Sequence, residues 1–160
     1  MGDLMLELFQ QVGLTDAEAA RLDELEGIVG RGLKTFVDVG TALLEIRDSR
    51  LYRREYGTFE DYCRARWNMQ RAHAYRMIEA ASVVNNLSPI GDIIPTTESQ
   101  ARPLTSLSPE MQPIAWQKVV DTAPDGKITA AHVQTVVDEM REREILDAAK
   151  RIQAEKREQR

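Results

Sequence analysis

The sequence predicts an all-α protein, in which a helix-turn-helix domain is flanked by a long N-terminal helix and a long C-terminal helix. Apolar residues recur every three or four positions along most of the 160 residues, and no stretch alternates as a half-buried strand would. Between residues 60 and 78, two short helical patterns are separated by about three residues. We divide the chain into an N-terminal brace or dimerisation segment (1–50), the helix-turn-helix domain (51–140) and a charged helical tail (141–160).

The N-terminal segment is expected to be helical throughout. Residues 3–12 resemble a short amphipathic helix, and Thr15 with Glu18 forms a capping box that starts the next one. One face of that helix carries the apolar set Leu22, Leu25, Val29, Leu33, Phe36, Gly40 and Leu43. Several glycines leave two alternatives open: a break near residues 27–32, or close helix packing where only glycine fits.

The central segment is basic, although the net charge of the chain is −5. Residues 47–76 contain eight arginines and four acids, whereas residues 1–46 contain three bases and nine acids. Because distant charges are screened within about 10 Å, local clustering matters more than the total for phosphate binding. Arginine is also the side chain best suited to bidentate contact with phosphate and guanine.

The helix-turn-helix pattern lies within this basic segment. Thr58 is a good N-cap for a helix over residues 59–66, and Asn68 suits the left-handed turn that follows. A second helix is expected over residues 70–84 and should end at Asn85-Asn86. The inward positions of the motif are assigned to Cys63, Trp67, Met69, Ala74 and Met77.

The outward face of the second helix then consists of Gln70, Arg71, His73, Tyr75 and Arg76. A recognition helix places its N-terminal residues on base edges in the major groove, where glutamine suits adenine and arginine suits guanine. Arg64 departs from the pattern, because that position is usually an alanine packed on the second helix; a long arginine can instead extend outward. Two helices with a tight turn also occur in domains that bind no DNA.

Helix signals resume after a linker over residues 85–97. Thr97 or Ser99 caps a short helix through Leu104, and Ser108-Pro109-Glu110 starts a helix that reaches Thr122. Residues 124–126 form a turn, and Thr129 caps the long C-terminal helix. We expect Trp116 to anchor the core. The inner face of the last helix is assigned to Val133, Val136, Val137, Met140 and Ile145.

The charged tail has two interpretations. Ile145, Ala149 and Ile152 form a thin apolar stripe that could be a short dimer seam, although a convincing coiled coil needs three or four heptads. The other interpretation is a solvated tail, which frays or leaves the domain after Ala149. A homodimer remains compatible with the sequence, because small DNA-binding domains commonly read paired half-sites as dimers.

Residues 58–137 resemble the DNA-binding half of the ParB family of partition proteins and their plasmid and phage relatives. The matching pieces are YCRARWNMQRAHAYRMIEAA, IIP at 93–95, SQARPL at 99–104, LSPEMQPIAWQKVV at 107–120 and KITAAHVQTVVDEM at 127–140. The resemblance implies base contacts by Gln70, Arg71, His73 and Arg76. It also implies a phosphate contact by Arg102, for which a helix-end ion pair is the alternative. Residues 1–57 lack the family's GERRxRA nucleotide-binding motif, so nucleotide binding is not implied.

Other chemistry finds little support in the sequence. The only histidines, His73 and His132, lie about 60 residues apart, and a single cysteine cannot complete a recognisable zinc site. Cys63 falls where the motif needs a small buried residue, and no GxSxG, HExxH or glycine-rich phosphate loop occurs. We therefore expect no catalytic residue, metal, cofactor or small-molecule substrate. No apolar run could span a membrane, and the acidic N-terminus resembles no export signal.

These observations together predict a sequence-specific double-stranded DNA-binding protein. It would regulate transcription or serve in partition and maintenance of a plasmid, phage or mobile element, in a bacterial cytoplasm at the nucleoid. Besides the second helix, the expected DNA contacts are made by Arg53, Arg54, Arg64, Arg66 and Arg102. The alternative is a protein-interaction module or a regulatory subunit that uses the arginine patch to bind an acidic partner.

Overall fold

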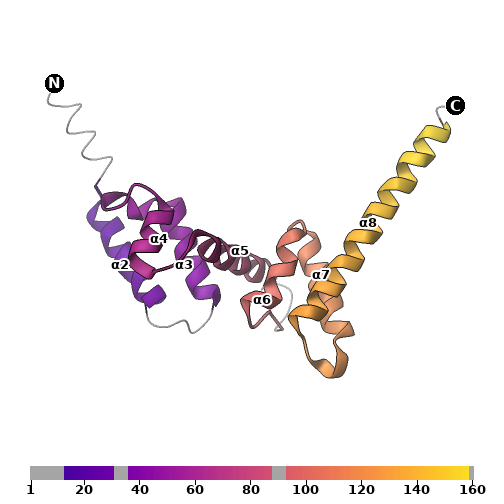
Figure 1. Cartoon of the computed structure of the whole chain (residues 1–160), viewed down its shortest axis with the longest axis horizontal. Coiled ribbons are helices and arrows are strands. Elements are labelled where there is room, and N and C mark those ends of the chain that lie inside the picture. Colours follow the sequence, from indigo (N-terminus) through magenta and orange to yellow (C-terminus); the bar gives the residue numbers. More distant parts are fainter. Residues whose placement is uncertain (1–12, 31–35, 88–92, 159–160) are drawn as a thin grey trace.

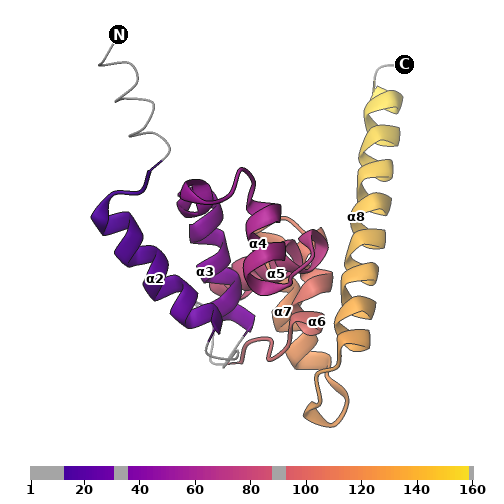
Figure 2. The same cartoon turned by 60° about the vertical axis from the view of Figure 1, so that its left-hand side comes forward.

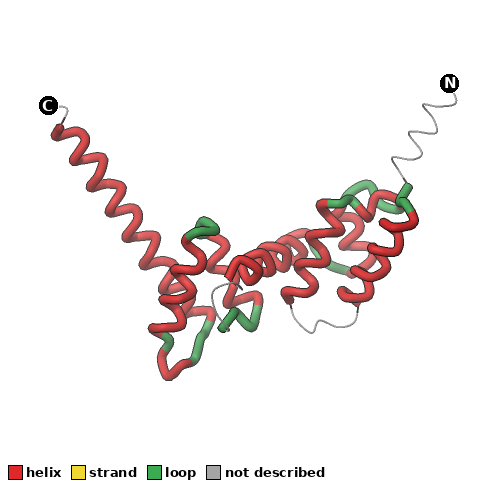
Figure 3. The backbone as a smooth tube through the Cα atoms, turned by 180° about the vertical axis from the view of Figure 1, so that it is seen from behind, coloured by secondary structure: helices red, strands yellow, loops and turns green. Residues whose placement is uncertain are grey.

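The computed structural model describes residues 13–30, 36–87 and 93–158, and helices are the only regular elements in these ranges (Figure 1; Figure 3). The prediction of an all-α chain is confirmed. None of the described helices is both long and apolar enough to cross a membrane. The helix expected over residues 3–12 lies outside the described residues.

The N-terminal region consists of two helices that pack on each other, α2 (Asp16–Gly30) and α3 (Phe36–Asp48), so the single long N-terminal helix that we expected is wrong. The capping box is confirmed: the Thr15 amide donates to the Glu18 carboxylate at 2.9 Å, and the Glu18 amide donates to Thr15 Oγ1 at 3.2 Å. Helix α2 ends at Gly30, within the glycine-containing stretch where a break was one alternative. The break lets Leu25 and Val29 join the buried core formed with α3.

The other alternative, close packing at a glycine, is realised at Gly40. A Cβ atom added there would lie 2.1 Å from the Met77 carbonyl oxygen and 2.5 Å from Ala81 Cβ. Both atoms belong to α5 (Arg71–Leu87), which crosses α3 at this point. Only glycine allows the two helix backbones to approach so closely.

The segment expected to form the helix-turn-helix consists of two helices, α4 (Phe59–Trp67) and α5, and the short 3₁₀ helix η1 (Leu51–Arg54) precedes them. Thr58 caps α4 by accepting the Asp61 amide at 3.1 Å, as expected. Asn68 adopts the left-handed conformation (φ 50°, ψ 38°) and donates its amide to the Arg64 carbonyl. The tight turn predicted from the asparagine is therefore confirmed.

Helix α5 continues to Leu87, so the end predicted at Asn85-Asn86 is wrong. Val84 and Leu87 are buried, and the Asn86 side chain donates hydrogen bonds to the Pro109 carbonyl at 2.7 Å and to Gln112 Oε1 at 3.1 Å. These tertiary contacts outweigh the weak helix propensity of asparagine.

The C-terminal half contains α6 (Glu98–Ala101), η2 (Arg102–Ser106), α7 (Met111–Thr122), η3 (Pro124–Gly126) and α8 (Ala130–Glu158). Thr97 and Thr129 accept the Gln100 and His132 amides as side-chain caps, as predicted. Helix α7 begins later than expected, and no side chain caps its start: the Met111 and Gln112 amides donate to the backbone carbonyl of Ser108.

Two apolar cores lie along the molecule, and α5 runs from one to the other (Figure 1). The first core joins α2, α3, α4 and the start of α5, including Ala74 and Met77. The second joins the end of α5 to α6, η2, α7 and the start of α8. Trp116 is the expected core anchor there: it is buried, and its indole N–H donates to the Ile93 carbonyl at 2.7 Å. Helix α5 thus ties both halves of the chain together.

The last part of α8 extends beyond the second core (Figure 2). Residues 141–158 are all exposed, yet they remain helical, so the tail leaves the domain without fraying before Glu158. Assignment of Ile145 to the inner face is wrong, because its side chain is 68% exposed. The other packed elements cover only the start of α8, where Val133, Val136 and Val137 are buried.

The Gly40 contact generates a stability prediction. Gly40→Ala should lower the free energy of unfolding by about 1–3 kcal/mol, since the added methyl group overlaps the backbone of α5. An alanine in an uncrowded helix would instead stabilise it by about 1 kcal/mol. Thermal unfolding followed by circular dichroism measures the change. Gly57→Ala is the matched control, because nothing lies within 4 Å of its added Cβ; an unchanged or raised Tm for Gly40→Ala would contradict the packing.

Candidate nucleic-acid interface

The inner face of the motif is an apolar contact between α4 and α5. Cys63 is fully buried there, with Ala74 and Met77 of α5 in the same core. Burial raises the pKa of the Cys63 thiol to about 12, so the thiol stays protonated and has a packing role. Phe59 and Tyr62 are also buried in this core, although the sequence interpretation did not assign them. Phe59 lies three residues before Tyr62 and four before Cys63, and this helical spacing was a signal that could have identified both.

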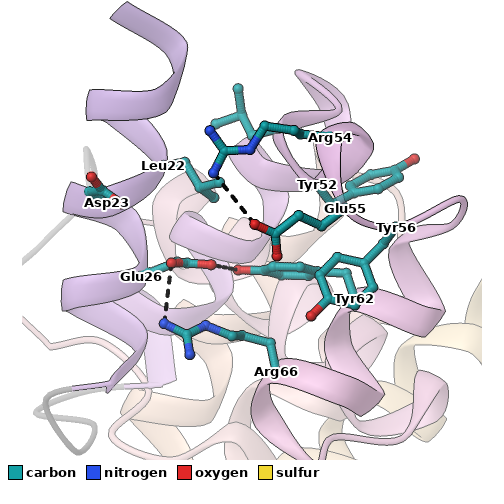
Figure 4. A pocket seen from close by; sticks show the side chains of 10 residues that line it. Leu22, Asp23, Glu26, Tyr52, Arg54, Glu55, Tyr56, Tyr62 and Arg66 are labelled. Carbon is teal, nitrogen blue, oxygen red and sulfur yellow. Dashed lines mark hydrogen bonds and ion pairs between the residues drawn. The ribbon is translucent and has the colours of Figure 1, made fainter. Parts of the chain in front are cut away.

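A polar network holds α4 against α2 (Figure 4). The Tyr62 hydroxyl donates to the Glu26 carboxylate at 3.0 Å and accepts the Trp67 indole N–H at 3.1 Å. Arg66 lies 3.5 Å from the same carboxylate. We expected Trp67 inside the core. It is only half-buried and packs against the edge of the core. The network borders a pocket of about 360 Å³ between α2, η1 and α4.

The start of α5 presents an exposed polar face. Gln70, Arg71, His73 and Arg76 are exposed, and the Arg71 side chain is 74% accessible. Ala74 and Met77, on the opposite face, are buried. This arrangement matches the predicted division of the helix into a packing face and an outward face.

Tyr75 is an exception, because it is half-buried between the two helices of the motif. Its ring meets the Phe59 ring edge-on with centroids 6.0 Å apart, and its hydroxyl donates to Glu60 at 3.1 Å. Burial, followed by the hydrogen bond with Glu60, raises the pKa of Tyr75. The guanidinium groups of Arg47 and Arg71 lie 5.4 and 5.5 Å from its ring centre. The Tyr75 ring therefore orients Arg47 and Arg71, and its hydroxyl is already hydrogen-bonded to Glu60.

Arg53 has a bracing role that the sequence interpretation missed. Its side chain is only 20% exposed and pairs with Glu18 at 2.8 Å. The guanidinium also donates to the Gly13 carbonyl at 3.2 Å. These contacts join η1 to the start of α2 and engage the guanidinium within the chain. Arg54 and Arg66 line the pocket beside α2, apart from the exposed face of α5.

Arg64 extends into solvent, as the outward alternative for this position required. Its side chain is 69% exposed and lies 3.3 Å from Asp61 on the same helix. The tight packing of Cys63 beside it is therefore undisturbed.

Arg102 forms a helix-end ion pair with Glu98, which was the alternative to a phosphate contact. Its Nε donates to Glu98 at 2.9 Å, and the guanidinium remains half exposed. The hydrogen bond and charge of Arg102, with smaller contributions from Arg76 and His73, lower the pKa of Glu98. Helix α5 and the α6–η2 segment thus bring three of the predicted site residues together. In the described part of the chain, Arg76 has no acidic group within 4 Å.

The described residues contain no group of three or more side chains that could hold a metal ion. No protein-family model, curated protein or solved structure matches this chain. The resemblance to ParB proteins therefore stays a prediction. Any function has to be inferred from the geometry of α4 and α5.

The polar network generates a second stability prediction. Tyr62→Phe should lower the free energy of unfolding by about 1–3 kcal/mol, because Glu26 and the Trp67 indole both lose a partially buried partner. Chemical denaturation gives the value. Tyr56→Phe is the control, since the Tyr56 hydroxyl makes no hydrogen bond to the described residues. Equal stability of the two variants would show that the network contributes nothing.

Proposed function

We propose that this chain binds double-stranded DNA sequence-specifically, with the start of α5 in the major groove. The observation that carries the proposal is the face of Gln70, Arg71, His73 and Arg76, exposed directly after a left-handed turn at Asn68. A recognition helix needs such a face at its N-terminal end, because those residues reach the base edges.

The side chains on this face suit base recognition. Arginine forms two hydrogen bonds with guanine, and glutamine forms two with adenine. Arg76 is unpaired among the described residues, and Arg71 lies 3.7 Å from Glu60 in an exposed position. Exposed ion pairs contribute about 0–1 kcal/mol, so Arg71 can exchange its carboxylate for a base at little cost.

The flanking arginines suit phosphate contacts for the same reason. Arg64 and Arg102 are more than half exposed, and each is paired with a neighbouring carboxylate on its own segment. A phosphate offers the same bidentate geometry as a carboxylate. The phosphate contact of Arg102 would place the α6–η2 segment beside the backbone of the duplex, next to Arg76 and His73.

The resemblance to ParB proteins gives this binding a biological context. It favours transcriptional regulation, or partition and maintenance of a plasmid, phage or mobile element, at the bacterial nucleoid. The second candidate is an acidic protein partner, and one observation favours it: arginines on this surface already bind carboxylates, in the pairs Arg64–Asp61, Arg71–Glu60 and Arg102–Glu98. Selection from random duplex DNA separates the two functions, since an acidic-protein binder would enrich no sequence.

The exposed face of Gln70, Arg71, His73 and Arg76 leads to a prediction about DNA sequence discrimination. Arg71→Ala with Arg76→Ala should lose about 1–3 kcal/mol of discrimination for each guanine contact. Non-specific affinity should fall less, because the other arginines remain. Competition between the selected site and scrambled duplex measures the discrimination. Lys127→Ala, in the exposed loop before α8, is the control; a double variant that discriminates as well as the parent would exclude the start of α5.

The division between bracing and phosphate-binding arginines gives a further prediction. Arg64→Ala should reduce the slope of log K against log salt concentration by about 0.9, the value for one phosphate contact. Arg53→Ala should lower Tm and leave that slope unchanged, because its guanidinium holds η1 to α2. Binding titrations over a range of salt concentrations measure both slopes. The opposite pattern would reverse the two roles.

A further inference from the structure

Met140 is the last residue of α8 that packs on the second core, and the helix from there to residue 158 continues straight without a further partner in the described chain (Figure 2). Its side chains are exposed from residue 141 onward, although three large apolar ones are among them. Ile145, Leu146 and Ile152 are 68%, 59% and 53% exposed. Helices in proteins gain most of their stability from packing of an apolar face, so contact with another apolar surface would stabilise this segment.

The apolar side chains form a narrow stripe. It consists of four residues on one face of the helix, separated by three, one and three positions: Ile145, Ala148, Ala149 and Ile152. The two alanines are at the centre of the stripe, where small side chains let two helices approach closely. Ala154 lies on the opposite face. The stripe therefore fits another narrow helix, not a broad globular surface.

The charges along the same segment identify which helix fits. Residues 140–149 carry three acids and two bases, whereas residues 150–158 carry four bases and two acids. A second copy in antiparallel orientation places the acidic half of each helix against the basic half of the other. A parallel copy places like charges together, which costs free energy.

We propose that residues 140–158 of α8 pair antiparallel with the same segment of a second copy of this chain. The stripe of each copy then lies on the other, with Ile145 of one copy near Ile152 of its partner. A two-helix contact of this length is smaller than a standard interface of about 1,600 Å², so the dimer is weak and concentration-dependent. Its affinity lies in about the micromolar range.

The antiparallel arrangement sets where the two copies of the α4–α5 motif lie. Nineteen helical residues span about 28 Å, and the two globular parts occupy opposite ends of that rod. Resting on the proposed function, this geometry fits two separated DNA segments better than two adjacent half-sites. The self-association itself needs no DNA, so its test is independent of DNA binding.

Sedimentation equilibrium of the full chain tests the dimer. We expect a monomer–dimer equilibrium that weakens between about 50 mM and about 500 mM salt, because opposite charges meet across the helices. Ile145→Gln with Ile152→Gln should weaken it at least tenfold. Ala154→Gln, the same substituent on the opposite face, should leave it unchanged. An unchanged Tm will show that the variants remain folded, since these side chains lie outside both cores.

Three results would overturn the proposal. They are a monomer at every concentration up to about 1 mM, a dimer that the double isoleucine variant leaves intact, and a dimer that strengthens with salt. The last two would assign self-association to another surface or to a parallel pair.

Cysteine cross-linking tests the orientation. The one native cysteine, Cys63, is buried, so cysteines introduced into the tail react selectively. A mixture of Ile145→Cys and Ile152→Cys proteins, tagged to differ in mass, should form mixed disulfides. Each variant alone should not, because two copies of one position lie about 10 Å apart along an antiparallel pair, beyond disulfide reach. Cross-linking of each variant with itself, without mixed products, would establish a parallel pair and overturn the proposal.

Discussion

The close approach of α3 and α5 at Gly40 is the contact on which the rest of the structure depends. The α5 backbone passes so near that a methyl group at Gly40 would overlap the Met77 carbonyl. This contact fixes the axis of α5 relative to the N-terminal helices. Helix α5 in turn supplies the outer face of the motif, closes the first core and starts the second. One glycine thus determines how the exposed polar face is presented.

Their partners divide the arginines of the basic segment into two classes that their number alone does not reveal. Arg53 and Arg66 connect the motif to acidic residues of α2 and keep η1 and α4 in place. Arg71 and Arg76 lie on the exposed face of α5. The acidic N-terminal helix therefore has a use within a DNA-binding interpretation: it neutralises the bracing arginines and leaves the outward ones for a ligand.

The proposed DNA binding and the proposed tail pairing place two functions at opposite ends of one chain. The motif belongs to the first core, whereas the exposed part of α8 projects from the second (Figure 1). Helix α5 is the rigid connection between them, because it is buried in both cores. Association through the tail would therefore set the spacing of two recognition faces without altering either face.

The sequence by itself determined the local features: the caps at Thr15, Thr58, Thr97 and Thr129 and the left-handed turn at Asn68. Each depends on hydrogen bonds between residues at most four positions apart, so a short pattern contains all the partners. The tertiary structure decided the fold of α2 onto α3, the extension of α5 past Asn86 and the bracing role of Arg53. Those outcomes depend on partners 12 or more residues away, such as Glu18 for Arg53 and Gln112 for Asn86. A local pattern cannot specify such partners, because the packing of whole helices brings them together.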